Sequence, residues 1–241
     1  MHSASLAKLF ASLIAILGPA PADSPKELQL KPGDQIVAIG DSITAGGGYL
    51  SACDAVFAAD YPELKIPKII NVGISGQKAE DLLPRFKKDV VDKKPQWVTL
   101  SIGINDVWHR LGQPHDPKVL ERYSENVAKM VDMAQAANIK VILLSPTVIQ
   151  EDETQEGNKR LLLYVAAEKK IAEEKKCEFV DLHKMFATVN ATKPGFFSDN
   201  WLTSDGVHMK PGGDALMALG ILRALGVPDA KSAAAPAAAS N

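Results

Sequence analysis

Short apolar runs alternate with longer segments of helical spacing along most of the chain. Runs rich in apolar and β-branched residues predict buried strands at 36–39, 68–72, 97–102, 140–144 and 178–182. Helical spacing predicts helices at 50–61, 81–91, 120–137, 158–175 and 213–225. The clearest of these is 120–137, in which apolar side chains recur on one face of the helix.

This alternation predicts an α/β fold. Near-continuous apolar strands separated by helices are typical of a parallel sheet that is covered on both faces. Right-handed crossovers then predict a three-layer α/β/α sandwich around a five-stranded parallel sheet. In such a sheet the residues just after each strand converge on one edge, where we expect the chemistry to lie.

The chain of 241 residues has no internal repeat, so we expect one domain, at residues 23–229. An apolar stretch at 6–17 followed by Ala20-Pro21-Ala22 predicts a signal peptide at residues 1–22. We therefore expect a secreted or periplasmic protein without stable membrane insertion after processing. The sparse positive charge before the stretch leaves a merely helical or disordered amino terminus as the alternative. The Ala-rich tail at 230–241 is predicted to be disordered.

The composition excludes some partners and does not by itself indicate a function. A net charge of -2 without a basic stripe argues against nucleic acid as a partner. The mixed-sign run at 168–176 is predicted to be a solvated helix face. Cys53 and Cys177 are predicted to be small buried residues, with their pairing left open. The sequence does not indicate an oligomeric state.

Two polar motifs predict a nucleophile and its base. Gly40-Asp41-Ser42-Ile43-Thr44 follows the first strand, which presents Ser42 at the carboxyl edge of the sheet. Near the end of the chain, Asp205 precedes His208 by three positions. An aspartate at that spacing can hold the Nδ1–H of the ring, which leaves Nε2 free to take a proton from a serine. We predict Ser42, His208 and Asp205 as nucleophile, base and orienting acid.

Four blocks in order resemble the SGNH hydrolase superfamily, the GDSL-like esterases and lipases. They are Gly40 to Thr44, with Ile43 where the namesake motif has Leu, then Asn71 to Gly76, Gly103 to Asp106, and Asp205 to His208. The resemblance spans roughly residues 35–225. It implies a flavodoxin-like fold and an acyl-enzyme mechanism that needs no cofactor.

The same blocks supply donors for an oxyanion hole. An ester carbonyl under attack develops negative charge, which preorganised N–H groups stabilise. We expect three donors, the backbone N–H groups of Ser42 and Gly76 and the side-chain amide of Asn105. The amide of Asn105 donates without placing a competing charge beside the oxyanion.

We predict no catalytic role for the other polar residues. Asp41 and Asp106 are predicted to make structural hydrogen bonds, and His183 is predicted to be a surface or loop histidine. The candidate lining of the substrate pocket is Trp108, His109 and Trp201, with ordinary packing as the alternative. Without an H-E-x-x-H pair or a cysteine cluster, no metal site is expected.

The expected function is a serine carboxylic-ester hydrolase acting on short-acyl esters such as O-acetylated carbohydrates. The expected partner is thus a small-molecule or carbohydrate ester. The alternatives are a lipid hydrolase of the lysophospholipase or thioesterase type, an acyltransferase, and a non-catalytic carbohydrate-binding module on the same scaffold. A phosphate-binding loop is excluded because Gly46-Gly47-Gly48 lacks the P-loop lysine. An α/β-hydrolase is disfavoured because the chain has no G-x-S-x-G motif.

Overall fold

The sheet has the five parallel strands that the sequence predicts. The computed structural model describes residues 3–22, 27–193 and 200–229. The strands pair in the order β2-β1-β3-β4-β5, and every pairing is parallel. All residues of β1 and β3 are buried, as expected for strands that are covered on both faces. The strands are β1 (Ile36–Gly40), β2 (Ile70–Asn71), β3 (Trp97–Ser101), β4 (Lys140–Leu144) and β5 (Glu178–Val180).

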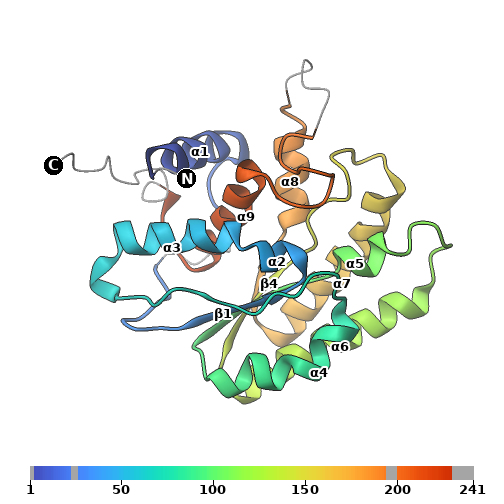
Figure 1. The fold of residues 1–241 in the computed structure, drawn as a ribbon, viewed down its shortest axis with the longest axis horizontal. Helices are drawn as coiled ribbons and strands as arrows, with labels where there is room; N and C mark the ends of the chain where they lie inside the picture. The colour runs from blue at the N-terminus through green and yellow to red at the C-terminus, as the bar shows by residue number, and fades with distance from the viewer. Residues whose placement is uncertain (1–2, 23–26, 194–199, 230–241) are drawn as a thin grey trace.

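Helices on both faces make the sheet the middle layer of a sandwich, which confirms the predicted α/β/α fold (Figure 1). One face carries α9 (Pro211–Ala224), against which α3 (Gly48–Asp60) and α8 (Leu182–Asn190) pack. The other face carries α4 (Ala79–Asp89), α6 (Pro117–Ala136) and α7 (Glu156–Lys175), packed in that order. The shorter elements include α2 (Ser42–Gly46), α5 (Ile104–Trp108) and the 3₁₀ turns Pro62–Leu64 and Val91–Lys93.

The periodicity of the sequence does not predict α2, α5 or α8. Helices α2 and α5 have five residues each, too few to repeat an apolar face. Helix α8 begins inside the strand predicted at 178–182. There the Asp181 side chain accepts the Lys184 N–H at 2.9 Å, which caps the helix and ends β5 at Val180.

The apolar amino-terminal segment forms helix α1 (Ser3–Leu17), which packs on α8 and α9. Its side chains Leu6, Phe10 and Leu13 are buried. No helix among the described residues is long and apolar enough to cross a membrane. The predicted boundary at residue 23 and the predicted tail at 230–241 lie outside the described residues.

The strand order reverses direction at β1, and this positions the site. Strand β1 lies between β2 and β3, so the segments after β1 and β3 leave the sheet toward opposite faces. Doubly wound sheets open a crevice at such a switch point, beyond the carboxyl ends of the strands. Ser42 follows β1 directly and Asn105 follows β3 closely, so both lie at this crevice.

Candidate active site

Ser42 is the first residue of α2, at the sharp turn that ends β1. A Cβ at Gly40 would lie 2.2 Å from Thr44 Oγ1 and 2.5 Å from the Ser101 carbonyl oxygen, so the turn needs glycine. Asp41 caps α2, because its Oδ1 accepts the Ile43 N–H at 2.9 Å. Burial raises the pKa of Asp41 to about 6. Asp41 thus has the structural hydrogen bond that the sequence predicts.

Ser42, His208 and Asp205 form one hydrogen-bonded chain. His208 Nε2 lies 2.9 Å from Ser42 Oγ, although the two residues are 166 positions apart. His208 Nδ1 lies 2.6 Å from Asp205 Oδ2. The other Asp205 oxygen accepts the backbone N–H groups of Val207 and His208 at 3.0 and 2.8 Å. The structure therefore brings together the three residues that the motifs single out.

The charge on Asp205 sets the tautomer of His208. Desolvation by itself would raise the pKa of Asp205, but hydrogen bonds from the backbone and ring of His208 and from Val207 outweigh it. The pKa of Asp205 is lowered to about 2. The carboxylate is thus ionised at neutral pH and accepts the Nδ1–H of His208. The Nε2 lone pair then faces the Ser42 hydroxyl.

A glutamate that the sequence analysis did not single out anchors the loop that carries Asp205. Glu151 follows β4, and its only signal in the sequence is its place after a predicted strand. Its carboxylate accepts four hydrogen bonds of 2.7 to 2.8 Å, from the backbone N–H groups of Trp201, Leu202 and Thr203 and from the Thr203 hydroxyl. Glu151 therefore fixes the approach to Asp205 through the main chain.

The three predicted oxyanion donors lie in the segments after β1, β2 and β3. Gly76 has a φ of +79°, in the left-handed region that favours glycine. Asn105 Nδ2 donates to the Gln77 carbonyl oxygen at 3.0 Å, which joins the segment after β3 to the residue beside Gly76. The backbone N–H groups of Ser42 and Gly76 make no hydrogen bond to another described residue.

The turn that carries Asn105 packs against a buried tyrosine and glutamate. The Tyr123 hydroxyl donates to the Ile102 carbonyl oxygen at 3.2 Å and also contacts the Glu168 carboxyl. Glu168 is fully buried, and burial raises its pKa well above the usual range. The prediction of a solvated face at 168–176 is wrong for Glu168, because α7 packs this residue against α6.

The candidate pocket residues differ in where they lie. The Trp108 ring is 6.1 Å from the His208 ring, edge to face, and His109 is 5.8 Å from Trp108. The Trp108 ring is thus a neighbour of both the His208 and the His109 rings. Trp201 instead lies in the loop that Glu151 holds, and its indole N–H donates to Asn190 Oδ1 at 2.8 Å.

The prediction of a surface or loop position for His183 is wrong. His183 lies in the first turn of α8 and is buried, with Nδ1 2.6 Å from the Thr147 carbonyl oxygen and Nε2 3.1 Å from Glu153. Both ring nitrogens are thus engaged within the fold. In the described part of the chain, no three His, Cys, Asp or Glu residues are grouped to hold a metal ion. Cys53 and Cys177 are free thiols, of which Cys53 is buried and Cys177 is half-buried.

A serine hydroxyl within reach of a histidine that a carboxylate orients is the arrangement found in serine hydrolases. Comparison with known proteins identifies the family. Residues 38–216 match the GDSL-like Lipase/Acylhydrolase family, and the chain belongs to it. The resemblance to SGNH hydrolases is thus confirmed, and the chain is a carboxylic ester hydrolase.

The chain is similar to an acetylxylan esterase of Geobacillus stearothermophilus, at 31% identity over 217 residues, 83% of this chain and 97% of that protein. The crystal structure of that esterase, Axe2, matches with a TM-score of 0.74. LAE5, an alpha/beta hydrolase enzyme from the metagenome of Lake Arreo, matches over 83% of this chain and 98% of its own at 27% identity, with a TM-score of 0.74. The uncharacterized lipoprotein YqeF of Bacillus subtilis (strain 168) is 33% identical over 118 residues, 46% of this chain and 48% of that protein.

Solved catalytic mutants of Axe2 replace a serine, an aspartate and a histidine by alanine. In that protein the aspartate precedes the histidine by three positions. Asp205 and His208 of this chain have the same spacing.

Proposed function

We propose that Ser42 attacks the ester carbonyl while His208 takes the serine proton through Nε2. Asp205 orients His208 and stabilises the imidazolium that forms. The N–H groups of Ser42, Gly76 and Asn105 bind the oxyanion of the tetrahedral intermediate. His208 then protonates the leaving alcohol, and water releases the acid from Ser42 by the same steps. The observation that carries this proposal is the contact of 2.9 Å between His208 Nε2 and Ser42 Oγ.

We propose short acyl groups on carbohydrates, acetyl groups above all, as the substrate class. The similarity to an acetylxylan esterase supports it. The openness of the site supports it too, because the side chains of His208 and Asp205 are 39% and 49% exposed. An open site admits a bulky oligosaccharide as the alcohol, and it offers little apolar surface to a long acyl chain.

The first test is hydrolysis of p-nitrophenyl esters from acetate to palmitate by wild type and by Ser42→Ala. We expect turnover to peak at acetate and Ser42→Ala to lower kcat by a factor of at least about 10⁴. Ser51→Ala is the matched control, since this exposed serine of α3 only donates to the Gly47 carbonyl oxygen. Full activity in Ser42→Ala would refute the mechanism, and a peak at long chains would favour the lipid hydrolase instead.

Acetylated xylo-oligosaccharides are the second substrate to test. Release of acetate into water supports the hydrolase, whereas transfer to an added sugar acceptor would make the protein an acyltransferase. Binding of the sugar without release of acetate would favour the carbohydrate-binding module.

We propose that residues 1–22 direct export and that residues 23–229 form the esterase domain. The apolar stretch at 6–17 and the lipoprotein among the relatives support secretion or a periplasmic location. The packing of α1 on α8 and α9 supports the opposite outcome, a helix that is kept. Sequencing the amino terminus of the protein from the expressing cell separates the two. A start at residue 23 supports export, and an intact Met1 contradicts it.

A further inference from the structure

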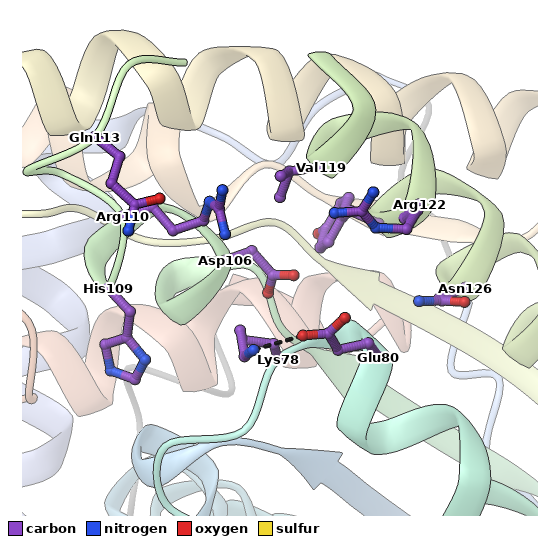
Figure 2. A pocket seen from close by; sticks show the side chains of 10 residues that line it. Lys78, Glu80, Asp106, His109, Arg110, Gln113, Val119, Arg122 and Asn126 are labelled. Carbon is purple, nitrogen blue, oxygen red and sulfur yellow. Dashed lines mark hydrogen bonds and ion pairs between the residues drawn. The ribbon is translucent and has the colours of Figure 1, made fainter. Parts of the chain in front are cut away.

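A cavity of about 170 Å³ lies next to the segments that carry Gly76 and Asn105 (Figure 2). It is lined by the segment that leads into α4, by the end of α5 and by the first turns of α6. The side chains that determine its chemistry are Lys78, Glu80, Asp106, His109, Arg110 and Arg122.

Two of the proposed oxyanion donors lie in the segments that form the cavity wall. Lys78 comes two positions after Gly76, and Asp106 comes directly after Asn105. On the side of the base, the Trp108 ring lies 6.1 Å from His208 and 5.8 Å from His109, which lines the cavity. The path from His208 through Trp108 to His109 is short enough for a short oligosaccharide to span.

The cavity has an excess of positive charge. Lys78 is paired with Glu80 at 2.5 Å. Neither Arg110 nor Arg122 has a side-chain hydrogen bond or ion pair with another described residue. Figure 2 shows both guanidinium groups and the Asp106 carboxyl around the same space. Both guanidinium groups therefore lie at the pocket without a hydrogen-bonded partner among the described residues, near the Glu80 carboxylate.

Asp106 does not cancel this charge under weakly acidic conditions. Its side chain is buried, and one oxygen accepts the Ala79 N–H at 3.3 Å. Burial raises the pKa of Asp106 to about 7, so the group takes up a proton near neutrality.

We propose that this cavity binds the carboxylate of a uronic acid substituent near the acetylated sugar, with Arg110 and Arg122 as its ligands. The proposal rests on the proposed function and narrows it to acidic acetylated oligosaccharides. A guanidinium group offers paired donors that match a carboxylate, and binding inside a cavity strengthens such charge-assisted bonds. The three cationic side chains Lys78, Arg110 and Arg122 outnumber the carboxyl groups of Glu80 and Asp106, so a further carboxylate is favoured over a neutral group.

The test compares two acetylated xylo-oligosaccharides of the same length. One carries a uronic acid substituent, and in the other the same carboxyl group is reduced to an alcohol. The readout is the ratio of the two kcat/KM values for acetate release, so that any general change in activity cancels. We expect wild type to prefer the acidic substrate by about tenfold, the effect of one charge-assisted pair.

Arg110→Gln/Arg122→Gln should bring this ratio close to one, and Arg110→Lys/Arg122→Lys should keep part of it. The matched control is Lys129→Gln/Lys170→Gln, which removes the same charge from exposed positions of α6 and α7 that do not line the cavity. This control should retain the wild-type ratio. A ratio of one in wild type, or an unchanged ratio in Arg110→Gln/Arg122→Gln, would overturn the proposal.

Failure of the proposed function has a different signature. If p-nitrophenyl acetate is hydrolysed but neither oligosaccharide is, the substrate class is wrong. Calorimetric titration of Ser42→Ala with the deacetylated acidic oligosaccharide and with its reduced form then tests the cavity by itself. Tighter binding of the acidic form supports the carboxylate site, and equal binding overturns it.

Discussion

The proposed base and the loop that leads to Asp205 are each held by a carboxylate. His208 is held by the Asp205 carboxylate, and the loop before Asp205 is held in turn by Glu151. The Glu151 side chain accepts four hydrogen bonds, three of them from main-chain N–H groups. One carboxylate therefore fixes the backbone of a loop that has no regular secondary structure of its own.

Replacing Glu151 should impair catalysis although its side chain takes no part in the proposed reaction. Glu151→Gln turns one acceptor oxygen into a donor, and Glu151→Ala leaves four donors without an acceptor. A displacement of the base by about 1 Å can cost a factor of about 100. We expect kcat for p-nitrophenyl acetate to fall about tenfold in Glu151→Gln and further in Glu151→Ala, with KM little changed.

The matched control is Glu156→Gln, which removes a carboxylate that pairs with Arg160 on the surface of α7. It should retain the wild-type kcat. A purely structural role for Glu151 would lower the free energy of unfolding and leave kcat of the folded protein unchanged.

At the scale of elements, the short helix α2 follows β1 and packs against the end of β2. Asn71 Nδ2 donates to the Thr44 carbonyl oxygen at 2.7 Å. A Cβ at Gly73 would lie 2.4 Å from the Ala45 nitrogen and 2.7 Å from the Thr44 carbonyl carbon. Both of these are backbone atoms of α2, so the helix would have to move as a unit.

Gly73→Ala should therefore displace the helix that carries Ser42. We expect a loss of about 1–3 kcal/mol in the free energy of unfolding, as for other overpacked sites, together with a fall in kcat. Gly46→Ala is the control within the same helix, because a Cβ there meets no atom within 4 Å. Gly46→Ala should be neutral or stabilising by up to about 1 kcal/mol. Urea unfolding and p-nitrophenyl acetate turnover measure the two effects. Equal behaviour of both variants would contradict the tight contact between Gly73 and α2.

At the scale of the whole molecule, several carboxyl groups are buried or half-buried. Burial raises the pKa of Asp41 to about 6, of Asp106 to about 7 and of Asp214 to about 6. Each group binds its proton more tightly in the folded chain than in the unfolded chain, whose value is near 3.8. Between about pH 4 and 7 the folded state therefore holds more protons, and the contribution of these groups to stability falls as the pH rises.

Asp106→Asn should remove one of these contributions while Asn keeps an acceptor for the Ala79 N–H. We expect the variant to gain stability relative to wild type at pH 8 and to lose that gain at pH 5, by about 1–3 kcal/mol in urea unfolding. Asp132→Asn is the control, since its carboxylate lies on the surface of α6 beside Lys175. A constant difference between Asp106→Asn and wild type at the two pH values would contradict a raised pKa for Asp106.

How far the sequence predicts this protein depends on whether a feature is local. The long helices and the strands are predicted to within a few residues because each buries a repeated apolar face. The helices α2 and α5 are too short to repeat one. His183 and Glu168 are misassigned because polar side chains that a neighbouring element buries look the same in the sequence as solvated ones.

The sequence by itself determined the alternation of strands and helices, the glycine-marked turns that follow the strands, and the Asp205-x-x-His208 pair. All of these follow from contacts within a few residues. Only the tertiary structure decided that His208 reaches Ser42 across 166 positions, that Glu151 holds the loop before Asp205, and that Arg110 and Arg122 face one cavity. These features arise where segments distant in the chain pack against one another, and the spacing of residues carries no record of that packing.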